Sequence, residues 1–466
     1  MKLIYGVKDR PAPGRLILFA LQQLLAILAA TIAVPMIIGN GMSISAALFG
    51  AGIGTIVYLL FTKFKSPVFL GSSFAFIGSM SAAFAGAASV AYLGYFGLII
   101  GALFAGLVYV IIAIIIKFAG VDWIDKVMPA VVIGPTVALI GLSLSTSAVG
   151  NIAGNVIDPA SGAYVMDVHG IVCLVCGLIT LAVTIVCSIY GKKLLKMIPF
   201  IIGILSGYVV AAIFTGFSYI EGAEALRIID FTQFSRMEWY PEFTFLRLFD
   251  IDYGAADMGA YIGTIAVAYI PVAFVVFAEH LADHKNISSI IETDLLKDPG
   301  LSRTLLGDGV GSIVGAFFGG CPNTTYGESI GCVAISGNAS VITILLTAIL
   351  AIVASFIAPF VTFLATIPDC VMGGVCMALY GFIAVSGLKM IQKVDLNDNK
   401  NLFVVSVILI AGVGGMALQF GEVTVTAIAC ALILGILANV LVNIRGKKKD
   451  GEETEEQSGV NKDETV

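Results

Sequence analysis

The fold of this chain depends on residues 319–328, which read Gly319-Gly-Cys-Pro-Asn-Thr-Thr-Tyr-Gly-Glu328. Three glycines, a proline and several polar groups interrupt an otherwise apolar part of the chain here. A second short stretch, rich in small residues, reads Pro67-Val-Phe-Leu-Gly-Ser-Ser-Phe-Ala-Phe76. Irregular backbone is not tolerated against lipid, because its N–H and C=O groups find no partners there. If the chain crosses a membrane, both stretches must be buried within the protein or line a cavity.

The composition places most of the chain in a membrane. Of the 466 residues, 59% are hydrophobic and 12% are charged, and the mean hydropathy is +1.01. Soluble domains contain about 25% charged residues, so charge is depleted as expected for segments in hydrocarbon. No basic patch interleaved with aromatic residues suggests nucleic-acid binding. The eight cysteines fall in or beside apolar segments, where we interpret them as small helix residues and predict no metal site.

Fourteen segments are predicted to cross the membrane, because a spanning helix needs about 20 mostly apolar residues. Three of them, 67–85, 306–320 and 321–337, are short or interrupted by Gly and Pro. With the N-terminus inside, 22 of the 25 Lys and Arg residues fall in inside loops, as the positive-inside rule requires. We therefore expect both termini in the cytoplasm and a disordered polar tail at 447–466. The long segments are 16–38, 44–62, 93–117, 127–146, 170–189, 197–216, 259–281, 339–363, 370–388, 402–419 and 424–443.

The chain also repeats itself. Asp125-Lys-Val-Met-Pro129 opens the fifth span, and Asp369-Cys-Val-Met-Gly373 opens the twelfth. Gly71-Ser-Ser-Phe74 in the third span is echoed by Asn323-Thr-Thr-Tyr326 in the tenth. Both echoes join spans seven apart, and because seven is odd the second copy must be inverted. Inverted repeats are common in secondary transporters, with the substrate site near the midplane where the repeats meet.

The two interrupted stretches suggest where a ligand would bind. If both are extended before they turn helical, they can pair as a short antiparallel ribbon, and each following helix then offers unpaired N–H groups at its N-terminus. Two ordinary kinked helices are the alternative. The sequence thus predicts an all-α polytopic membrane protein with fourteen transmembrane segments in a seven-plus-seven inverted repeat, with short antiparallel β-strands in spans 3 and 10.

Two glutamates lie at predicted membrane depth. Glu279 ends the apolar run that begins at Tyr269, and Glu328 follows Gly327 in the interrupted tenth span. A buried carboxylate costs several kcal/mol unless it is paired or protonated, so such a residue marks function by default, although a structural ion pair is the alternative. Two carboxylates suit a planar solute whose N–H groups donate to them while its C=O groups accept from backbone N–H groups. Phe74 and Tyr326 could stack on such a ring.

A carboxyl group removed from water favours its protonated form, so one glutamate could carry a proton across. Asp283 lies four residues after Glu279, on the same helical face, and is either part of a proton relay or an ordinary charge at a solvated helix end. We interpret His280 and His169 as structural and Asp308 as an interhelical partner. Gln22 and Gln23 are interpreted as interhelical hydrogen-bond donors or as groups near the substrate.

These stretches resemble a known family. Ala278-Glu-His-Leu-Ala-Asp-His284, Asn323-Thr-Thr-Tyr-Gly-Glu-Ser-Ile-Gly331 and Leu70-Gly-Ser-Ser-Phe-Ala-Phe76 look like the nucleobase–ascorbate transporter family, in particular its bacterial uracil permeases. The likeness runs from about Gly6 to Lys400 and includes Asp294-Leu-Leu-Lys-Asp-Pro-Gly300. It implies a proton-coupled carrier that holds its substrate by carboxylates at Glu279 and Glu328, with dimers through a gate domain.

The resemblance also implies a division into domains. Residues 1–126 and 258–365 would form a core domain, and residues 127–257 and 366–446 a gate domain. The predicted substrate-binding residues are Glu279, Glu328, Phe74, Gly327, Tyr326 and Ala30, and the predicted proton-coupling residues are Glu279, Asp283 and Glu328.

The chain departs from the family pattern at two serines and one aspartate. Ser329 replaces an asparagine and Ser336 a threonine, which bears on substrate range, and Asp283 stands where some relatives have His, which bears on the proton route. A glutamate at position 328, rather than the glutamine of xanthine carriers, favours uracil.

The sequence therefore predicts a carrier that imports uracil with a proton across the bacterial inner membrane, with no cofactor and with lipid and uracil as partners. A permease for xanthine, uric acid or another nucleobase is the first alternative, and an anion exchanger on a similar inverted repeat is the second. No nucleophile elbow, metal-ligand cluster or phosphate loop suggests an enzyme.

Overall fold

The computed structural model describes residues 3–87, 90–120, 129–192, 194–255, 257–420 and 423–443. Part of the first sequence echo, 125–128, and the predicted cytoplasmic tail, 447–466, lie outside the described residues. So do several basic residues used in the topology prediction, which are Lys2, Lys126, Lys193, Arg445, Lys447, Lys448, Lys449 and Lys462.

The first half of the chain is helical apart from one short strand. Ser43 and Asp167 begin two of its helices, because their side chains accept hydrogen bonds from backbone N–H groups of the first turn. The elements are α1 (Pro13–Ile38), α2 (Ile44–Phe61), β1 (Leu70–Ser72), the 3-10 turn η1 (Phe74–Phe76), α3 (Ile77–Gly86), α4 (Leu93–Ala119), α6 (Ala130–Ser143), α7 (Ser145–Ile152), α8 (Val168–Tyr190), α9 (Leu194–Met197) and α10 (Pro199–Phe217).

The second half follows a connection of short turns, η2 (Glu224–Leu226), η3 (Phe231–Arg236), η4 (Thr244–Asp250) and η5 (Tyr253–Ala255). Asp257 then caps the longest helix, α11, by accepting from the N–H groups of Gly259 and Ala260. The further elements are α11 (Met258–Ile291), η6 (Leu296–Gly300), α12 (Leu301–Gly319), β2 (Asn323–Thr325), α13 (Gly327–Ser336), α14 (Val341–Ser355), α15 (Ala358–Ala365), α16 (Asp369–Ile391), α17 (Asn399–Val413), β3 (Leu418–Phe420), β4 (Val423–Val425) and α18 (Ala427–Asn443).

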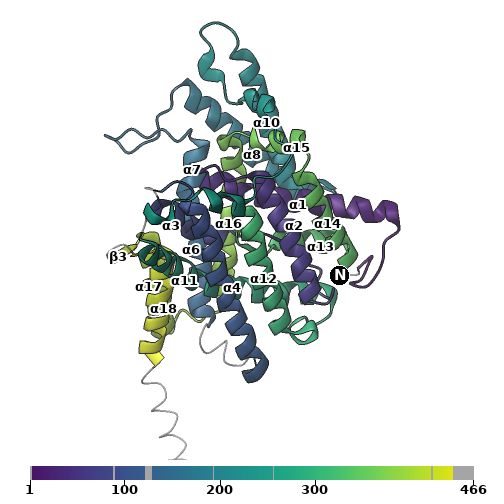
Figure 1. The fold of residues 1–466 in the computed structure, drawn as a ribbon, viewed down its shortest axis with the longest axis vertical. Helices are drawn as coiled ribbons and strands as arrows, with labels where there is room; N and C mark the ends of the chain where they lie inside the picture. Colours follow the sequence, from purple (N-terminus) through teal and green to yellow (C-terminus); the bar gives the residue numbers. More distant parts are fainter. Residues whose placement is uncertain are drawn as a thin grey trace, which may run out of the picture.

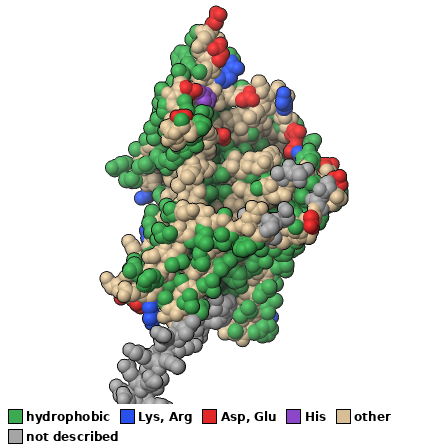
Figure 2. All heavy atoms as spheres, turned by 90° about the vertical axis from the view of Figure 1, so that its left-hand side faces the viewer, with side chains coloured by type: hydrophobic (Ala, Val, Ile, Leu, Met, Phe, Trp, Pro, Cys, Tyr) green, Lys and Arg blue, Asp and Glu red, His purple; other side chains and the backbone are tan. Residues whose placement is uncertain are grey.

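The described helices include eight that are long and apolar enough to cross a membrane, and a bent pair, α14 and α15, adds a ninth if it forms one span. Three shorter apolar helices lie at Phe74–Gly86, Asn399–Val413 and Ala427–Asn443. Figure 2 shows a face on which hydrophobic side chains predominate over the lower half, while acidic and basic side chains gather mainly near the upper end. Apolar surface of this extent is expected against lipid.

The strands β1 and β2 pair antiparallel, although 253 residues separate Leu70 from Asn323 in the sequence (323 − 70). Gly71 lies opposite Thr324, and Ser72 lies opposite Asn323, so the two echoing stretches of the sequence contact each other directly. Gly320 ends α12 in the left-handed region, with a φ of 74°, and Pro322 follows. The chain therefore leaves α12, runs extended through β2 and starts α13 in the interior.

A second two-stranded sheet corrects the prediction for the end of the chain. The segment 402–419 was expected to be helical throughout, but α17 ends at Val413 and Leu418–Phe420 pairs with Val423–Val425. Gly414 and Gly415 follow the helix, and Gly415 has a φ of 68° that stops it. The apolar run continues past the glycines, which is why hydropathy alone did not show the break.

The helices pack in two groups. In the first, α12 packs against α2 and α4, α11 against α3 and α4, and α14 against α1 and α2. In the second, α16 packs against α6, α7 and α8, α10 against α8, and α17 against α6 and α18. Figure 1 shows α17 and α18 side by side at one edge of the molecule, away from α1 and α2. Contacts of α1 with α10 and α16, and of α11 with α6 and α18, join the two groups.

Candidate functional site

A cavity of about 370 Å³ lies between the two groups of helices. Its wall on the first group comes mainly from α11, β2 and α13, which supply three carboxyl groups. Its wall on the second group comes from α6, α8, α10 and α16, with side chains such as Val137, Phe200 and Phe382. One wall is therefore acidic and the opposite wall is largely apolar.

Glu279 and Asp283 line the cavity from neighbouring turns of α11. Residues four apart lie on the same face of a helix, so both carboxyl groups reach the same space. The hydroxyl of Thr325, on β2, donates a hydrogen bond of 2.7 Å to Asp283 Oδ2. This bond joins α11 to the strand pair. Neither acid forms an ion pair within 4.0 Å among the described residues.

Glu328 lies in the first turn of α13, directly after β2, and lines the same cavity as Glu279. Gly327 begins the helix and is exposed to the cavity, and the side chain of the N-cap residue, Tyr326, makes no capping hydrogen bond to the first turn. The first N–H groups of a helix lack intrahelical partners and carry partial positive charge, so they suit a carbonyl or an anion. Two acidic groups and an uncapped helix start thus converge on one space.

Two predicted aromatic residues lie at the cavity in different ways. Phe74 lines it and meets Tyr380 of α16 edge to face, with the ring centroids 5.7 Å apart. Tyr326 also lines it, but its hydroxyl donates 2.9 Å to the backbone oxygen of Ser72 and its side chain is largely buried. Tyr326 therefore holds β1 against β2, which leaves Phe74 as the more accessible ring.

Ala30 is the one predicted substrate-binding residue that the structure does not bring to the cavity. It is buried in α1, and Ala26, one helical turn earlier, lines the cavity instead. The two alanines lie on the same face of α1, so the difference concerns which turn of the helix meets the space.

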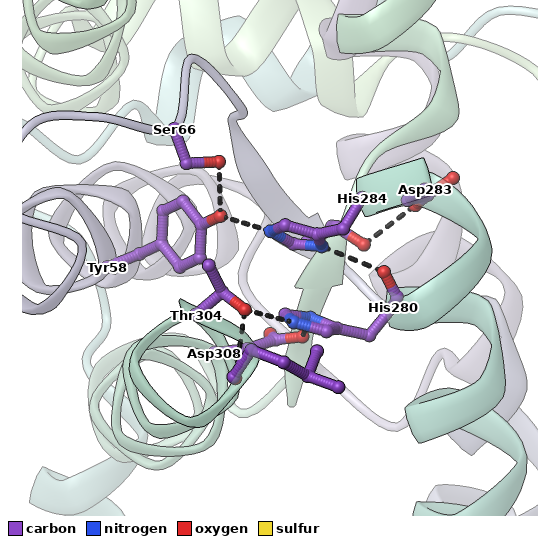
Figure 3. A network of polar contacts seen from close by, with 9 residues as sticks. Tyr58, Ser66, His280, Asp283, His284, Thr304 and Asp308 are labelled. Carbon is purple, nitrogen blue, oxygen red and sulfur yellow. Dashed lines mark hydrogen bonds and ion pairs between the residues drawn. The ribbon is translucent and has the colours of Figure 1, made fainter. Parts of the chain in front are cut away.

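A buried polar cluster joins α11 to α2 and α12, and its histidine, tyrosine and Asp308 side chains do not line the cavity (Figure 3). His280 Nδ1 lies 2.7 Å from Asp308 Oδ2 on α12, and His284 Nε2 lies 2.7 Å from the hydroxyl of Tyr58 on α2. All four side chains are sealed from solvent. The interpretation of Asp308 as an interhelical partner is confirmed.

This cluster explains why Glu279 and Asp283 face the cavity. The two histidine rings stack with their centroids 4.0 Å apart, and His284 Nδ1 lies 2.8 Å from the backbone oxygen of His280. Each histidine follows a cavity acid by one residue, which is a rotation of about 100° around the helix. Anchoring the histidines to α2 and α12 therefore turns the two acids toward the other group of helices.

Ser329, one of the departures from the family pattern, does not line the cavity. Its hydroxyl accepts from Gln23 Nε2 at 2.5 Å and from the backbone N–H of Phe69 at 3.1 Å. It is fully buried, so it joins α1, the start of β1 and α13. The interpretation of Gln23 as an interhelical donor is confirmed, and the effect of Ser329 on substrate range can only be indirect.

Replacing Ser329 by alanine is expected to destabilise the protein by about 1–3 kcal/mol, because the buried N–H of Phe69 then lacks an acceptor and Gln23 Nε2 keeps only the backbone oxygen of Ser329, at 3.2 Å. Unfolding of the purified protein in mixed micelles measures this change. Ser145→Ala is the control, since that exposed hydroxyl only bonds within its own turn, to Leu142 O, and we expect a change within about 0.5 kcal/mol. Equal stability of Ser329→Ala and the unmodified protein would show that this junction is not needed.

Sequence reasoning missed the residues of the opposite wall. Tyr380 does not line the cavity itself but is nearly buried against Phe74, which does, and its hydroxyl has no hydrogen-bond partner among the described residues. Ser188 and Ser386 also line the cavity, as does Lys196 of α9. The hydroxyl of Tyr380, in the middle of an apolar span, was the one feature of the sequence that pointed to the neighbourhood of this wall. In the described part of the chain, no group of three or more His, Cys, Asp and Glu side chains is arranged to hold a metal ion.

Known proteins match this chain over most of its length. The sequence model described as "Permease family" matches residues 14–421. The chain is 38% identical to the uracil permease of Bacillus caldolyticus, over 98% of this chain and 99% of the relative. It is 38% identical to the uracil permease of Bacillus subtilis, over 98% of both chains, and 34% identical to that of Escherichia coli K12, over 92% of both.

Solved structures show the same fold at low identity. The transmembrane domain of the cyanobacterium bicarbonate transporter BicA superposes with a TM-score of 0.63 at 15% identity, over 93% of this chain and 99% of that one. The murine Slc26a9 anion transporter superposes with a TM-score of 0.64 at 13% identity, over 94% of this chain and 69% of that one. At such identities the likeness concerns the fold alone.

The family match covers most of the chain, and the relatives align over nearly their full lengths. With its apolar helices, this makes the protein an integral membrane transporter and not an enzyme. The two glutamates, the paired strands and the sequence around them all lie within the matched region, so the chain belongs to the nucleobase–ascorbate transporter family of permeases.

Proposed function

We propose that this protein imports uracil together with a proton across the bacterial inner membrane, by alternating access between a core and a gate domain. The observation that carries the proposal is that Glu279 and Glu328 line one cavity, beside an uncapped helix start. The names of the relatives, uracil permeases from several bacteria, support uracil as the substrate.

The chemistry of the cavity suits a planar cyclic amide. Uracil has two ring N–H donors and two carbonyl acceptors. The carboxylates of Glu279 and Glu328 can accept from its N–H groups, and the N–H groups at the start of α13 can donate to a carbonyl. Phe74 supplies a ring edge or face for the flat side of the base.

The packing of the helices supports fourteen spans in a seven-plus-seven inverted repeat. We take α1, α2, α3, α4, α6 with α7, α8 and α10 as the first seven, and α11, α12, α13, α14, α16, α17 and α18 as the second. If the helices of the two halves correspond in this order, each contact should have a counterpart. The contact of α4 with α12 then corresponds to that of α14 with α2, and both are present. In the same way, α8 with α10 corresponds to α17 with α18, and α1 with α10 corresponds to α11 with α18. Such symmetry is expected of a repeated fold.

The two packed groups correspond to the proposed domains. The core comprises α1 to α4 and α11 to α14, and the gate comprises α6 to α10 and α16 to α18. The cavity between them has its three carboxyl groups on core elements, and its wall on gate elements is largely apolar. Movement of the core domain relative to the largely apolar wall of the gate domain would carry the substrate across the membrane. The Lys and Arg distribution supports a cytoplasmic position for both termini, and a homodimer through the gate stays a prediction.

The acids of the cavity are the proposed proton carriers. Glu279, Asp283 and Glu328 lie in one space without a paired cation within 4.0 Å among the described residues. Several carboxylates confined together repel one another, so at least one of them favours its protonated form. The proton enters from outside with the substrate and leaves on the inside, and no cofactor is needed.

The fold is shared with anion transporters, but the cavity argues against an anion here. Among the described residues three acids and a single lysine line it, and an anionic substrate would be repelled by any acid that is ionised. Other nucleobases are distinguished from uracil by competition, with unlabelled uracil, xanthine and uric acid each present in excess over labelled uracil.

The proposal predicts that purified protein in proteoliposomes accumulates labelled uracil when the outside is one pH unit more acidic than the inside. Free-energy coupling to one proton allows about tenfold accumulation at that gradient. A protonophore should abolish the accumulation and leave only equilibration. Equal uptake with and without the gradient would contradict proton coupling, and no specific uracil uptake would contradict the substrate.

A further inference from the structure

One basic residue lies among the described residues that line the cavity, and it comes from the gate. Lys196 belongs to α9, the short helix between α8 and α10, and its side chain is exposed. No carboxyl group lies within 4.0 Å of its amine in the described part of the chain. Its charge is therefore available to the cavity without being neutralised by a direct partner.

The cavity extends from the acids toward Lys196. Three of its lining residues lie at the ends of helices. These are Ser188 near the end of α8, Ile335 near the end of α13 and Met390 near the end of α16. The loops that follow these helices are assigned to the inside by the positive-inside rule. Lys196 thus stands at the mouth of a cavity that extends toward the cytoplasm in this conformation.

The helix α9 also forms the contact between the domains at this end. It packs against α8 and α10 of the gate and against α1 and α13 of the core. Met197 and Ile198, next to Lys196, pack with Ala26 of α1 and Cys332 of α13 in one apolar cluster. The position of Lys196 relative to the core therefore depends on this interface, which must change when the core moves.

The acids are all on the core. Glu279 and Asp283 come from α11 and Glu328 from α13, and apart from Lys196 no other charged side chain among the described residues lines the cavity. Other titratable groups packed around α11 are buried, and Tyr58, His280, His284 and Asp308 form the polar cluster of Figure 3. Tyr109 of α4 packs against His280, and Tyr261 and Tyr269 lie on α11 itself. The hydroxyl of Tyr326 is bonded to the backbone of Ser72, and that of Tyr380 is buried in the gate.

We propose that Lys196 is a positioning residue for proton release, whose charge lowers the proton affinity of the core acids when the cavity is open to the inside. A positive charge near a carboxyl group favours its ionised form. When the core moves to face outward, its acids leave the gate-borne lysine and recover their affinity for a proton. The inference rests on the proposed proton coupling and adds a reason why the proton is released on the inner side.

The magnitude follows from Coulomb's law. A unit charge about 10 Å away at an effective dielectric constant of about 20 moves a titration by roughly one pH unit. Exchange of labelled for unlabelled uracil, measured in proteoliposomes at equal pH on both sides, gives the pH at which the rate is half-maximal. We expect this midpoint to rise by about one pH unit in Lys196→Gln, because the acids then keep their protons to a higher pH.

The chain offers a matched control. Lys192 is exposed in the connection between α8 and α9, four residues before Lys196, and does not line the cavity. Lys192→Gln removes the same charge from the same end of the protein, and Lys196→Arg keeps the charge at the mouth. Both variants are expected to retain the midpoint of the unmodified protein to within about 0.3 pH units.

Restoring the positive charge by chemical labelling distinguishes an effect of the charge from a folding defect in Lys196→Gln. Lys196→Cys labelled with an aminoethyl methanethiosulfonate, which is cationic, should regain the original midpoint, whereas labelling with the neutral methyl reagent should leave it raised. The unmodified protein treated with both reagents controls for its own cysteines.

Each outcome decides the inference. An unchanged midpoint in Lys196→Gln, an equal shift in Lys192→Gln, or the same midpoint after labelling with either reagent would overturn the role of Lys196. If the unmodified protein carries uracil with a proton in these cases, the proposed function stands without this inference. A protein that exchanges uracil at a rate independent of pH and moves no proton would overturn both.

Discussion

Replacing Glu279 by glutamine is expected to reduce uracil uptake by at least about 100-fold. The amide has the size of the carboxyl group but cannot carry a negative charge or a transferable proton. A hydrogen bond to a charged group contributes about 1.5–3 kcal/mol, which alone corresponds to about 10- to 150-fold in affinity. Loss of a proton carrier adds to this effect. Initial rates of labelled uracil uptake in cells, normalised to the amount of protein in the membrane, measure it.

The control residue, Glu292, directly follows the last residue of α11. Glu292→Gln makes the same chemical change at an exposed residue that does not line the cavity, and we expect uptake within about twofold of the unmodified protein. Uptake by a correctly inserted Glu279→Gln at the unmodified rate would remove the basis of the site. Glu328→Gln, on the other acidic element, is expected to show a loss similar to that of Glu279→Gln.

Replacing Asp308 by leucine is expected to destabilise the protein by about 3–5 kcal/mol, because it breaks a fully buried contact and leaves His280 without its partner. The same change removes one of the two hydrogen-bond contacts that His280 makes with α12 and leaves the one to Thr304, at 3.1 Å. Glu279 and Asp283 then lose part of the support that turns them toward the cavity. Unfolding by SDS in mixed micelles, followed by circular dichroism, gives the change in the free energy of unfolding.

Asp308→Asn separates charge from contact in this cluster. The amide retains an oxygen that accepts from His280 Nδ1, so we expect a smaller loss, of about 1–2 kcal/mol. A leucine variant as stable as the unmodified protein would show that the cluster does not hold α11 in place. Uptake that falls in proportion to folded protein would place the role of Asp308 in stability alone.

The acidic wall could be predicted from the sequence because its residues are unusual within apolar membrane-spanning segments. Glu279 and Glu328 are costly within apolar segments, and the glycines and proline before Glu328 are costly within a spanning helix. Such features are visible without coordinates. The structure adds that both carboxyl groups face one space, which required knowing how α11 and α13 are rotated.

The apolar wall could not be found in this way. Phe200, Phe382 and Val137 are ordinary residues of a spanning helix, and only the packing of the two groups of helices brings them to the cavity. Lys196 was read as one of many inside charges, since its relation to the acids depends on the path of α9. Each of these residues reaches the cavity because helices that are distant in the sequence pack together, and a local sequence pattern does not specify that packing.

Smaller differences have the same origin. Ser329 faces Gln23 and the start of β1 rather than the cavity, because the first turn of α13 points Glu328 and Ser329 in different directions. Ala30 lies one turn beyond the part of α1 that meets the cavity. Distinguishing neighbouring residues or turns of a helix requires the position of its partners, not its sequence alone.

The position of bound uracil in an experimental structure of the complex tests the account most directly. We predict that the base occupies the space between α11 and α13, with its ring N–H groups within about 3.2 Å of carboxyl oxygens of both Glu279 and Glu328. A base bound outside this cavity, or held without either acid, would contradict the account.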